Sequence, residues 1–187
     1  AGVDASRIHS MPNWAPRGLT PATAARIERR RQKWELQGRF VIAYSGNFGR
    51  VHALEPIIEV ATLLRDDPGC VFLLVGNGAQ EDRLRALVRA RRLPNVRFEP
   101  TQPRDDLAVT LGVGDVHFVT LHERCADLVF PSKYYGILAV GRPLIFVGPA
   151  GCELAQAITQ QGIGGVFAPG DATAMATLLR AWRRHPD

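Results

Sequence analysis

Short apolar runs alternate with helical patterns along most of this chain. Consecutive apolar residues, as at 70–75, predict a strand covered on both faces, and apolar residues at three- and four-residue spacing predict helices. The predicted strands are residues 40–45, 70–75, 96–99, 116–121, 144–147 and 165–168. The predicted helices cover about 54–64, 84–88, 103–111, 132–140, 153–160 and the segment after Asp171. This alternation predicts an α/β fold, a Rossmann-like parallel sheet of about six strands with helices on both faces.

The beginning of the chain does not follow this pattern. A proline-rich stretch at 11–14 is followed by a basic helix predicted over about 21–37. The chain starts with Ala1, and we expect it to be an excised part of a longer protein. With 187 residues and 46% hydrophobic content, it can bury one full core. We therefore predict a linker segment and helix at 1–38 and one domain at 39–187.

The chain is basic, with a formal net charge of +5 and a pI near 9.6. Its arginines cluster at 29–31, 89–92 and 183–184, mostly on or just after predicted helices. No aromatic residues alternate with them as stacking platforms, so we expect no nucleic-acid partner. The clusters are predicted to be solvated helix faces. The less favoured interpretation is that these clusters attract the full-length protein to an anionic membrane surface.

Two further features concern the compartment. No apolar run approaches the ~20 residues of a membrane span, and no secretory signal opens the sequence. Cys70, Cys125 and Cys152 lack the spacing of metal ligands, which favours buried or idle thiols in a reducing cytosol. We expect a cytoplasmic protein, either free or at the cytoplasmic membrane surface.

The junction after the first predicted strand can bind phosphate. Gly46 and Gly49 leave backbone amides accessible, and Arg50 offers a forked donor suited to phosphate oxygens. The alternative is a plain tight turn, which is common after strands. The segment matches neither G-x-G-x-x-G nor G-x-x-x-x-G-K-[ST], so neither dinucleotide nor P-loop chemistry follows from it.

A second junction of this kind opens the helix predicted at 132–140. Ser132 and Lys133 give a hydroxyl, an ammonium and free amides at a helix start, although simple capping by Ser132 is the alternative. Gly136 costs ~1 kcal/mol relative to alanine inside a helix, so we expect something to pack closely against that turn. Because both junctions lie at the carboxyl ends of strands, together they suit a diphosphate ligand.

The long loop at 121–132 holds the densest group of ionisable residues. Glu123 or Asp127 could bind sugar hydroxyls, and His122 could carry a proton. His52, at the mouth of the first loop, could meet a phosphate when it is protonated. A merely solvated polar loop is the simpler interpretation of this segment.

Together, these motifs resemble those of the carboxyl-terminal half of retaining GT-B glycosyltransferases of family four. The segments that carry the resemblance are 8–14 (IHSMPNW), 44–50 (YSGNFGR), 73–78 (LLVGNG), 95–98 (NVRF), 129–136 (VFPSKYYG) and 141–143 (GRP). The resemblance implies a nucleotide-sugar-binding domain at 39–187. The site residues it implies are Gly46, Asn47, Gly49, Arg50, Ser132 and Lys133 for the diphosphate, Gly76, Thr101, Gln102 and Gly136 near the base and ribose, and Glu123, Asp127 and Leu128 near the sugar.

The chain departs from the family pattern at three positions. Asn47 and His52 stand where many members carry an arginine and a lysine, and Gly136 stands where many carry a ribose-binding glutamate. The E-x(7)-E pattern is absent as well. Recognition of the ribose and the identity of the donor sugar therefore stay open.

The resemblance implies a donor-binding domain whose parent transfers a sugar from a nucleoside diphosphate, with UDP expected, to a glycan or lipid-linked acceptor. Its implied partners are the nucleotide sugar, which is a substrate, and an amino-terminal acceptor-binding domain. We expect no cofactor, no metal ion and no transfer by this segment alone. The alternatives are an epimerase using Glu123 and Asp127, a binding module without turnover, and an unrelated flavodoxin-like or dinucleotide-binding domain.

Overall fold

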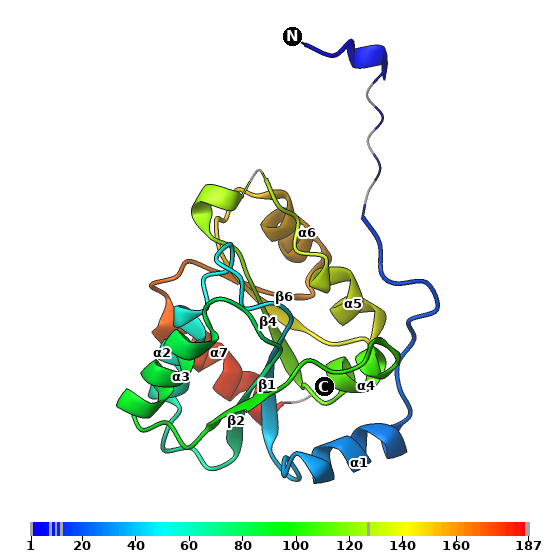
Figure 1. The fold of residues 1–187 in the computed structure, drawn as a ribbon. Coiled ribbons are helices and arrows are strands. Elements are labelled where there is room, and N and C mark those ends of the chain that lie inside the picture. Colours follow the sequence, from blue (N-terminus) through cyan, green and yellow to red (C-terminus); the bar gives the residue numbers. More distant parts are fainter. Residues whose placement is uncertain (1, 8, 10, 12, 127, 186–187) are drawn as a thin grey trace.

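The computed structural model describes residues 2–7, 9, 11, 13–126 and 128–185. Its centre is a six-stranded sheet in which every pair of neighbouring strands is parallel (Figure 1). The strands are β1 (Phe40–Ser45), β2 (Cys70–Val75), β3 (Val96–Glu99), β4 (Val116–Thr120), β5 (Leu144–Val147) and β6 (Gly164–Phe167). Their order, β3-β2-β1-β4-β5-β6, is that of a Rossmann fold, which confirms the predicted fold class.

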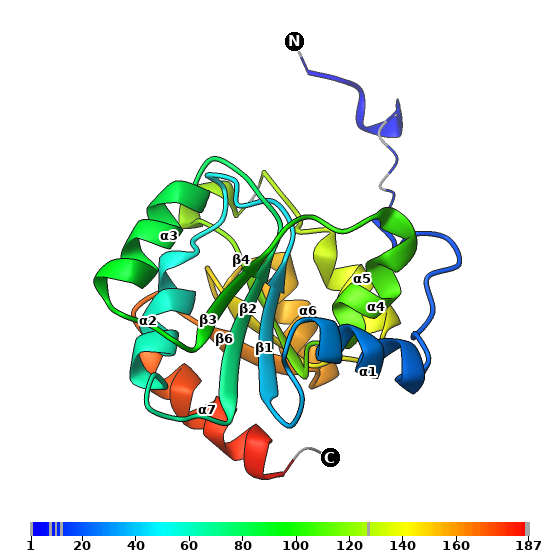
Figure 2. The same cartoon turned by 60° about the horizontal axis from the view of Figure 1, so that its bottom comes forward.

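Helices cover both faces of the sheet (Figure 2). The helices are α1 (Ala24–Lys33), α2 (Glu55–Leu63), α3 (Glu81–Ala90), α4 (Leu107–Gly112), α5 (Lys133–Ala139), α6 (Glu153–Gln161) and α7 (Ala172–Arg184), with short 3-10 helices at Ala5–Arg7, Arg104–Asp106 and Glu123–Cys125. Helices α2, α3 and α7 pack on one face, and α1, α4, α5 and α6 pack on the other. Apolar side chains from both faces of the strands are buried beneath them, as the continuous apolar runs predict.

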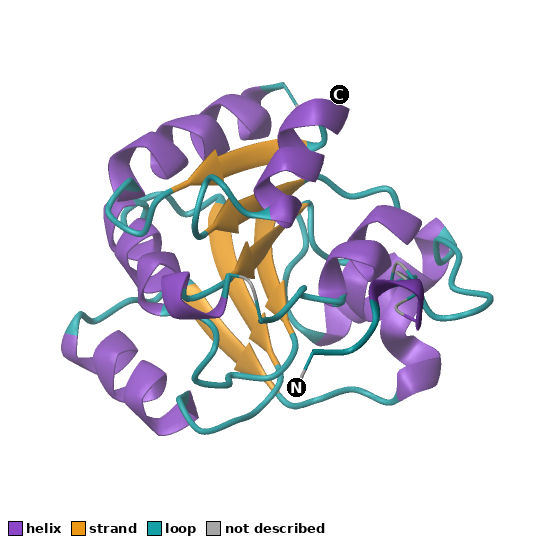
Figure 3. Ribbon diagram, turned by 90° about the horizontal axis from the view of Figure 1, so that it is seen from above, coloured by secondary structure: helices purple, strands orange, loops and turns teal. Residues whose placement is uncertain are grey.

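The strand order creates a switch point between β1 and β4. These strands are neighbours, with Ile42 beside Val116 and Ala43 beside His117. The strand that follows β1 in the chain, β2, lies on one side of this pair, and the strand that follows β4, β5, lies on the other side. A crevice between the loops at the carboxyl ends of such strands is where open α/β sheets bind ligands. Figure 3 looks onto the carboxyl ends of the strands, where the loops that follow them gather. The switch point thus brings the loops after β1 and β4 together.

Helix α1 is shorter than the sequence predicts, because the chain turns inward after Lys33. Trp34 and Leu36 are both buried against the sheet. Between them Glu35 has a φ of 52°, a left-handed conformation that ends the helix. The burial of two large apolar side chains outweighs the helical propensity of the predicted stretch to residue 37.

Two arginines of the predicted solvated face of α1, Arg30 and Arg31, are instead largely covered, whereas Arg29 is exposed as predicted. Arg31 donates to a carboxylate oxygen of Asp115 at 2.7 Å, and Arg30 donates to Asp106 at 2.7 Å. Their side chains are only 16% and 13% exposed, because α1 lies against the sheet and α4. These pairs fasten α1 to the domain.

Two helix starts differ in detail from their prediction. Pro103 has an extended backbone (φ −54°, ψ 148°) and lies outside the helix predicted to begin there. The helical segment starts as the 3-10 helix at Arg104–Asp106 and becomes α-helical only at Leu107. Ser132 occupies the N-cap position of α5, but its side chain makes no capping hydrogen bond. Ser132 already has helical φ and ψ, whereas a capping side chain requires an extended backbone.

Within the described ranges, no helix combines the length and the apolar character that crossing a membrane requires. All three cysteines are free thiols, with Cys70 and Cys152 buried and Cys125 partly buried.

Candidate functional site

The loop after β1, residues 46–52, is held by backbone hydrogen bonds to the loop after β2. Gly46 N donates to Val75 O at 2.9 Å, and Phe48 N donates to Asn77 O at 2.8 Å. The Phe48 ring points inward and is completely buried. These bonds fix the backbone of the loop, but they also occupy the Gly46 amide, which the sequence analysis expected to be accessible to phosphate.

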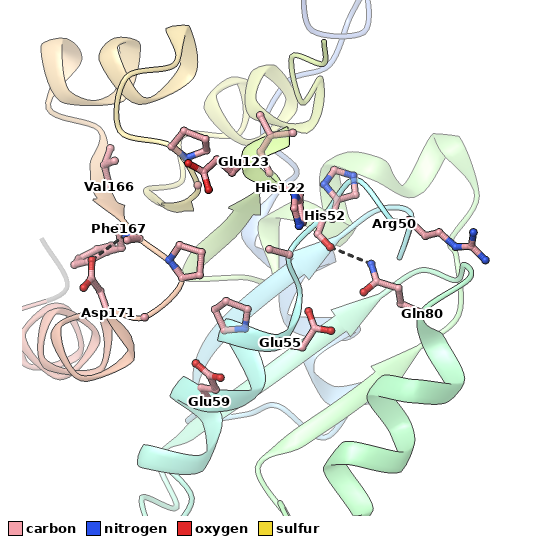
Figure 4. A pocket seen from close by; sticks show the side chains of 18 of the residues that line it. Arg50, His52, Glu55, Glu59, Gln80, His122, Glu123, Val166, Phe167 and Asp171 are labelled. Atoms are coloured by element: carbon pink, nitrogen blue, oxygen red, sulfur yellow. Dashed lines mark hydrogen bonds between the residues drawn. The ribbon is translucent and has the colours of Figure 1, made fainter. Parts of the chain in front are cut away.

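Gln80 also fastens this loop, a role that the sequence analysis missed. Its side-chain amide donates to Gly49 O at 2.6 Å and to His52 O at 3.0 Å, the latter drawn in Figure 4. Its backbone amide donates to Phe48 O. Gln80 lies just before α3, four residues before the start of the helix predicted there, and nothing in the sequence signals bonds to a loop about thirty residues away.

The two loops approach each other closely enough to require glycine. A Cβ at Gly76 would lie 2.0 Å from Gly46 O, and a Cβ at Gly78 would lie 2.3 Å from Asn47 Oδ1. Gly76 and Gly78 also have φ values of 145° and 147°, which L-residues rarely adopt. The glycine at the end of β2 is thus explained by this contact between loops.

Lys133, the first residue of α5, points toward the first loop. Its Nζ is buried and has no hydrogen-bond partner among the described residues. Instead it lies 3.7 Å from the centroid of the Tyr44 ring, and a Cβ built on Gly46 would come within 3.2 Å of it. Burial lowers the pKa of this amine to about 7. An unpartnered amine beside an open glycine backbone is suited to receive an anion.

His52 lies in the same crevice in a defined tautomer. Its Nδ1 is 2.7 Å from Thr120 O, and a carbonyl oxygen can only accept, so Nδ1 carries the proton. Burial, and then the positive charge of Lys133, lower the pKa of the His52 ring. The neutral ring does not fit the protonated, phosphate-binding role expected for it. It can instead accept a hydrogen bond at Nε2.

The predicted diphosphate residues fall into two groups. Gly46 and Lys133 come together in the crevice. Arg50 is exposed on the outer side of the first loop, where its side chain points away from the His52 ring (Figure 4). Asn47 and Ser132 are exposed, and Gly49 lies against the Asn47 side chain.

The residues predicted near the base lie at the ends of β2 and β3. Thr101 is exposed, whereas Gln102 accepts a hydrogen bond from Arg30 of α1 at 2.9 Å. Glu99, which the sequence analysis did not name, ends β3 beside Gly76, and burial raises the pKa of its carboxyl group. Helix α1 therefore contributes to this end of the site.

Gly136 is buried by the chain itself. A Cβ there would lie 3.2 Å from Leu111 Cδ1 and 3.7 Å from Leu19 Cδ2. The close packing that a glycine inside this helix predicts is present, and apolar side chains supply it. This position offers no polar group to a ribose.

On the other side of the first loop is a cleft of about 1150 Å³ (Figure 4). Of the described residues for which the sequence analysis predicted a role at the donor, Arg50, His52, His122 and Glu123 line it. Its polar lining also includes Glu55, Glu59, Gln80, Arg83 and Asp171. Glu59 comes from α2, and Asp171 comes from the segment that begins α7 (Figure 4). His52 lines this cleft and also lies close enough to Lys133 to feel its charge, so the cleft extends toward the Lys133 amine.

The loop after β4 supplies the residues predicted near the donor sugar. Glu123 is exposed, and Leu128 is exposed to 79%. Asp127 lies outside the described residues. In the part of the chain that the structure describes, no group of three or more histidine, cysteine, aspartate or glutamate side chains is arranged to hold a metal ion.

Comparison with known proteins identifies the family. Residues 26–186 match the family model of glycosyl transferases group 1, and the chain belongs to that family. It is 36% identical over 182 residues to WcaI of Escherichia coli K12, whose name assigns it to colanic acid biosynthesis as a glycosyl transferase. That alignment covers 96% of this chain and 44% of WcaI, so the chain spans less than half of the relative's length.

Solved glycosyltransferases share the fold. The structure of WaaG, a glycosyltransferase involved in lipopolysaccharide biosynthesis, matches with a TM-score of 0.76 and 17% identity over 95% of this chain and 48% of WaaG. Anabaena HepE, solved in complex with UDP-glucose, matches with a TM-score of 0.72 and 17% identity over 88% of this chain and 44% of HepE. These likenesses agree with the expected GT-B relationship.

Proposed function

We propose that this chain is the donor-binding domain of a glycosyltransferase that moves a sugar from a nucleoside diphosphate, foremost UDP, to a glycan or lipid-linked acceptor. The buried Nζ of Lys133 beside Gly46 carries the proposal, because that amine has no partner among the described residues. A diphosphate oxygen in the crevice would supply the missing partner. The UDP-glucose bound to HepE and the colanic acid assignment of WcaI support the choice of ligand and product class.

The chemistry that we propose is electrostatic. Charge builds up on the diphosphate as the bond to the sugar breaks, and positioned cations and amides stabilise such charge most effectively where water is excluded. Lys133 would hold the diphosphate on one side, with the Asn47 and Gly49 amides of the first loop beside it and Arg50 reaching it from the exposed side of the loop. We further propose a retaining reaction without a metal ion, since these cations can carry the stabilisation.

The acceptor would come from elsewhere in the full-length enzyme. Transfer requires an acceptor hydroxyl held ~3–3.5 Å from the anomeric carbon, and such positioning supplies much of the rate. We propose that an amino-terminal domain provides this surface in the parent protein. Association of that parent with a membrane surface is part of the same proposal.

Titration of the ¹⁵N-labelled chain with UDP-glucose, GDP-mannose, ADP-glucose and NAD, followed by NMR, tests the function. We expect at least one nucleotide sugar, and not NAD, to shift amides of residues 46–52, 76–80 and 132–134. Shifts confined to the opposite edge of the sheet, near Leu93 or Pro143, would contradict the site. Conversion of the bound sugar to its epimer would favour the epimerase alternative.

A further inference from the structure

The described surroundings of Lys133 contain no negative charge to balance a protonated amine. Among the described residues, no carboxylate lies within ion-pair distance of Nζ, and its close neighbour is the Tyr44 ring. The amine faces the π-face of the ring, and the ring hydroxyl donates to Asn47 O at 2.9 Å. A cation–π contact stabilises a buried ammonium group less than the loss of its hydration destabilises it.

The titratable groups on neighbouring elements also disfavour a positive charge there. His52 on the β1–α2 loop and His117 on β4 both lie close enough to feel the charge of Lys133. His117 is completely buried and hydrogen-bonded to Leu111 O at 2.8 Å. Burial lowers the pKa of both rings, and it lowers that of Lys133 to about 7. Among the residues that the structure describes, the titratable neighbours of Lys133 are thus neutral or positive.

We propose that this site binds the diphosphate of its donor together with one proton, and that Lys133 carries that proton. The inference rests on the function proposed above. In the empty crevice the amine is largely neutral at slightly alkaline pH, since no anion stabilises its charge. A diphosphate oxygen beside Gly46 supplies that anion, so the amine takes up a proton from solvent as the ligand binds. When the diphosphate leaves, the amine releases the proton again.

This coupling gives donor affinity a defined dependence on pH. Below about pH 7 the amine is protonated in both states, and affinity should not change with pH. Above that value each bound donor must bring a proton, and the affinity should fall by up to about tenfold per pH unit. A nucleotide sugar is the right probe, because its diphosphate has no titrating terminal phosphate near neutral pH, unlike a free nucleotide with a pKa of ~6.

The sequence allows the proton to be observed directly, because the chain contains only two lysines, Lys33 and Lys133. Protein labelled with ¹³Cε-lysine gives two signals, and Lys133→Arg identifies the one of interest. Titrated from about pH 5.5 to about pH 9, the empty protein should show the Lys133 signal changing near pH 7. With saturating UDP-glucose the midpoint should rise by at least about one pH unit, while the Lys33 signal serves as an internal reference.

Variants separate Lys133 from its neighbours. Arginine is not deprotonated in proteins, so Lys133→Arg should bind UDP-glucose with an affinity that is flat between about pH 6 and about pH 8.5. His52→Gln should keep the wild-type slope. A slope that persists in Lys133→Arg, or a midpoint that UDP-glucose does not move, would overturn the proton coupling while leaving the proposed function intact. If neither UDP-glucose, GDP-mannose nor ADP-glucose binds at any pH, both proposals fail together.

Discussion

Nζ of Lys133 lies 3.7 Å from the centroid of the Tyr44 ring, and this contact joins the first turn of α5 to the end of β1. These residues are 89 positions apart in the sequence, and they meet because β1 and β4 are neighbours at the switch point. The contact places an amine under the glycine backbone of the first loop. The chemistry of the crevice is therefore a direct consequence of the strand order.

Replacing Lys133 should stabilise the ligand-free protein at low pH. The native pKa is about 7, and the unfolded chain has an ordinary value of ~10.4, so the unfolded state binds more protons between these values. Wild-type stability therefore rises with pH in this window, by up to ~1.4 kcal/mol per unit. Lys133→Met lacks this dependence, and its advantage in melting temperature should be largest near pH 6 and shrink toward pH 10. Lys33→Met is the control. If the melting temperature of Lys133→Met exceeded that of the wild type equally at every pH, the burial of a titrating amine at Lys133 would be contradicted.

Arg50→Ala should weaken donor binding about tenfold. Loss of a charge-assisted hydrogen bond costs ~1.5–3 kcal/mol, and the exposure of Arg50 favours the lower end. Asn47→Ala, which removes no charge, should have a smaller effect. Calorimetric or NMR titration measures both, with Arg89→Ala on α3 as a matched control. An Arg50→Ala affinity equal to that of the control would remove Arg50 from the diphosphate site.

Gly76→Ala should disrupt the contact between the first two loops. Its Cβ would lie 2.0 Å from Gly46 O, at a φ that alanine rarely adopts, so one loop must move. The expected result is a loss of more than ~1 kcal/mol in stability and loss of donor binding. Gly151→Ala is the control, because nothing lies within 4 Å of the added Cβ. Thermal unfolding compares the two, and similar melting temperatures would show that the loops are free to separate.

Removing the Gln80 side-chain amide should loosen the first loop without unfolding the domain. Gln80→Leu breaks the bonds to Gly49 O and His52 O, each worth ~0.5–1.5 kcal/mol. Amide hydrogen exchange of residues 49–52 should become faster, and donor affinity should fall several-fold. Gln156→Leu removes an exposed bond to Gly151 O and serves as the control. Unchanged exchange in Gln80→Leu would mean that the backbone bonds suffice.

This chain alone should bind donor and transfer nothing. The surface that would position an acceptor is proposed to lie on another domain, so the donor pocket would be open to water. Binding should accordingly be weak, with a Kd around the millimolar scale, ~−4 kcal/mol. Incubation with nucleotide sugars and a panel of lipid and glycan acceptors should yield no glycosylated product. Sustained acceptor-dependent release of nucleoside diphosphate would show that the chain is a complete enzyme.

The strands were predictable because their burial on two faces leaves continuous apolar runs. All six predicted strands are present, with ends that move by one residue at β4 and β6. Helix ends were less predictable. At α1 the inward turn depends on where Trp34 and Leu36 find apolar neighbours, which is a property of the assembled sheet.

The candidate site was predictable only in part, for a similar reason. The glycines at the ends of β1 and β2 indicate that another group approaches the backbone closely. They do not indicate that the loops after β1 and β2 approach each other. Lys133 was expected to be a fixed cation, yet its burial under Tyr44 depends on contacts between distant segments. The bonds of Gln80 and the tautomer of His52 likewise exist only in the folded chain.

The contact between Gly46 and Gly76 also has an evolutionary consequence. Because the Gly46 carbonyl oxygen occupies the space where a side chain at position 76 would start, the loop after β2 cannot acquire bulk there while the loop after β1 keeps its path. A lineage that changes its donor preference through these loops would have to alter both together, or leave both unchanged and vary the surrounding side chains. Diversification of this domain should therefore be concentrated in positions such as 99–102 and 121–128.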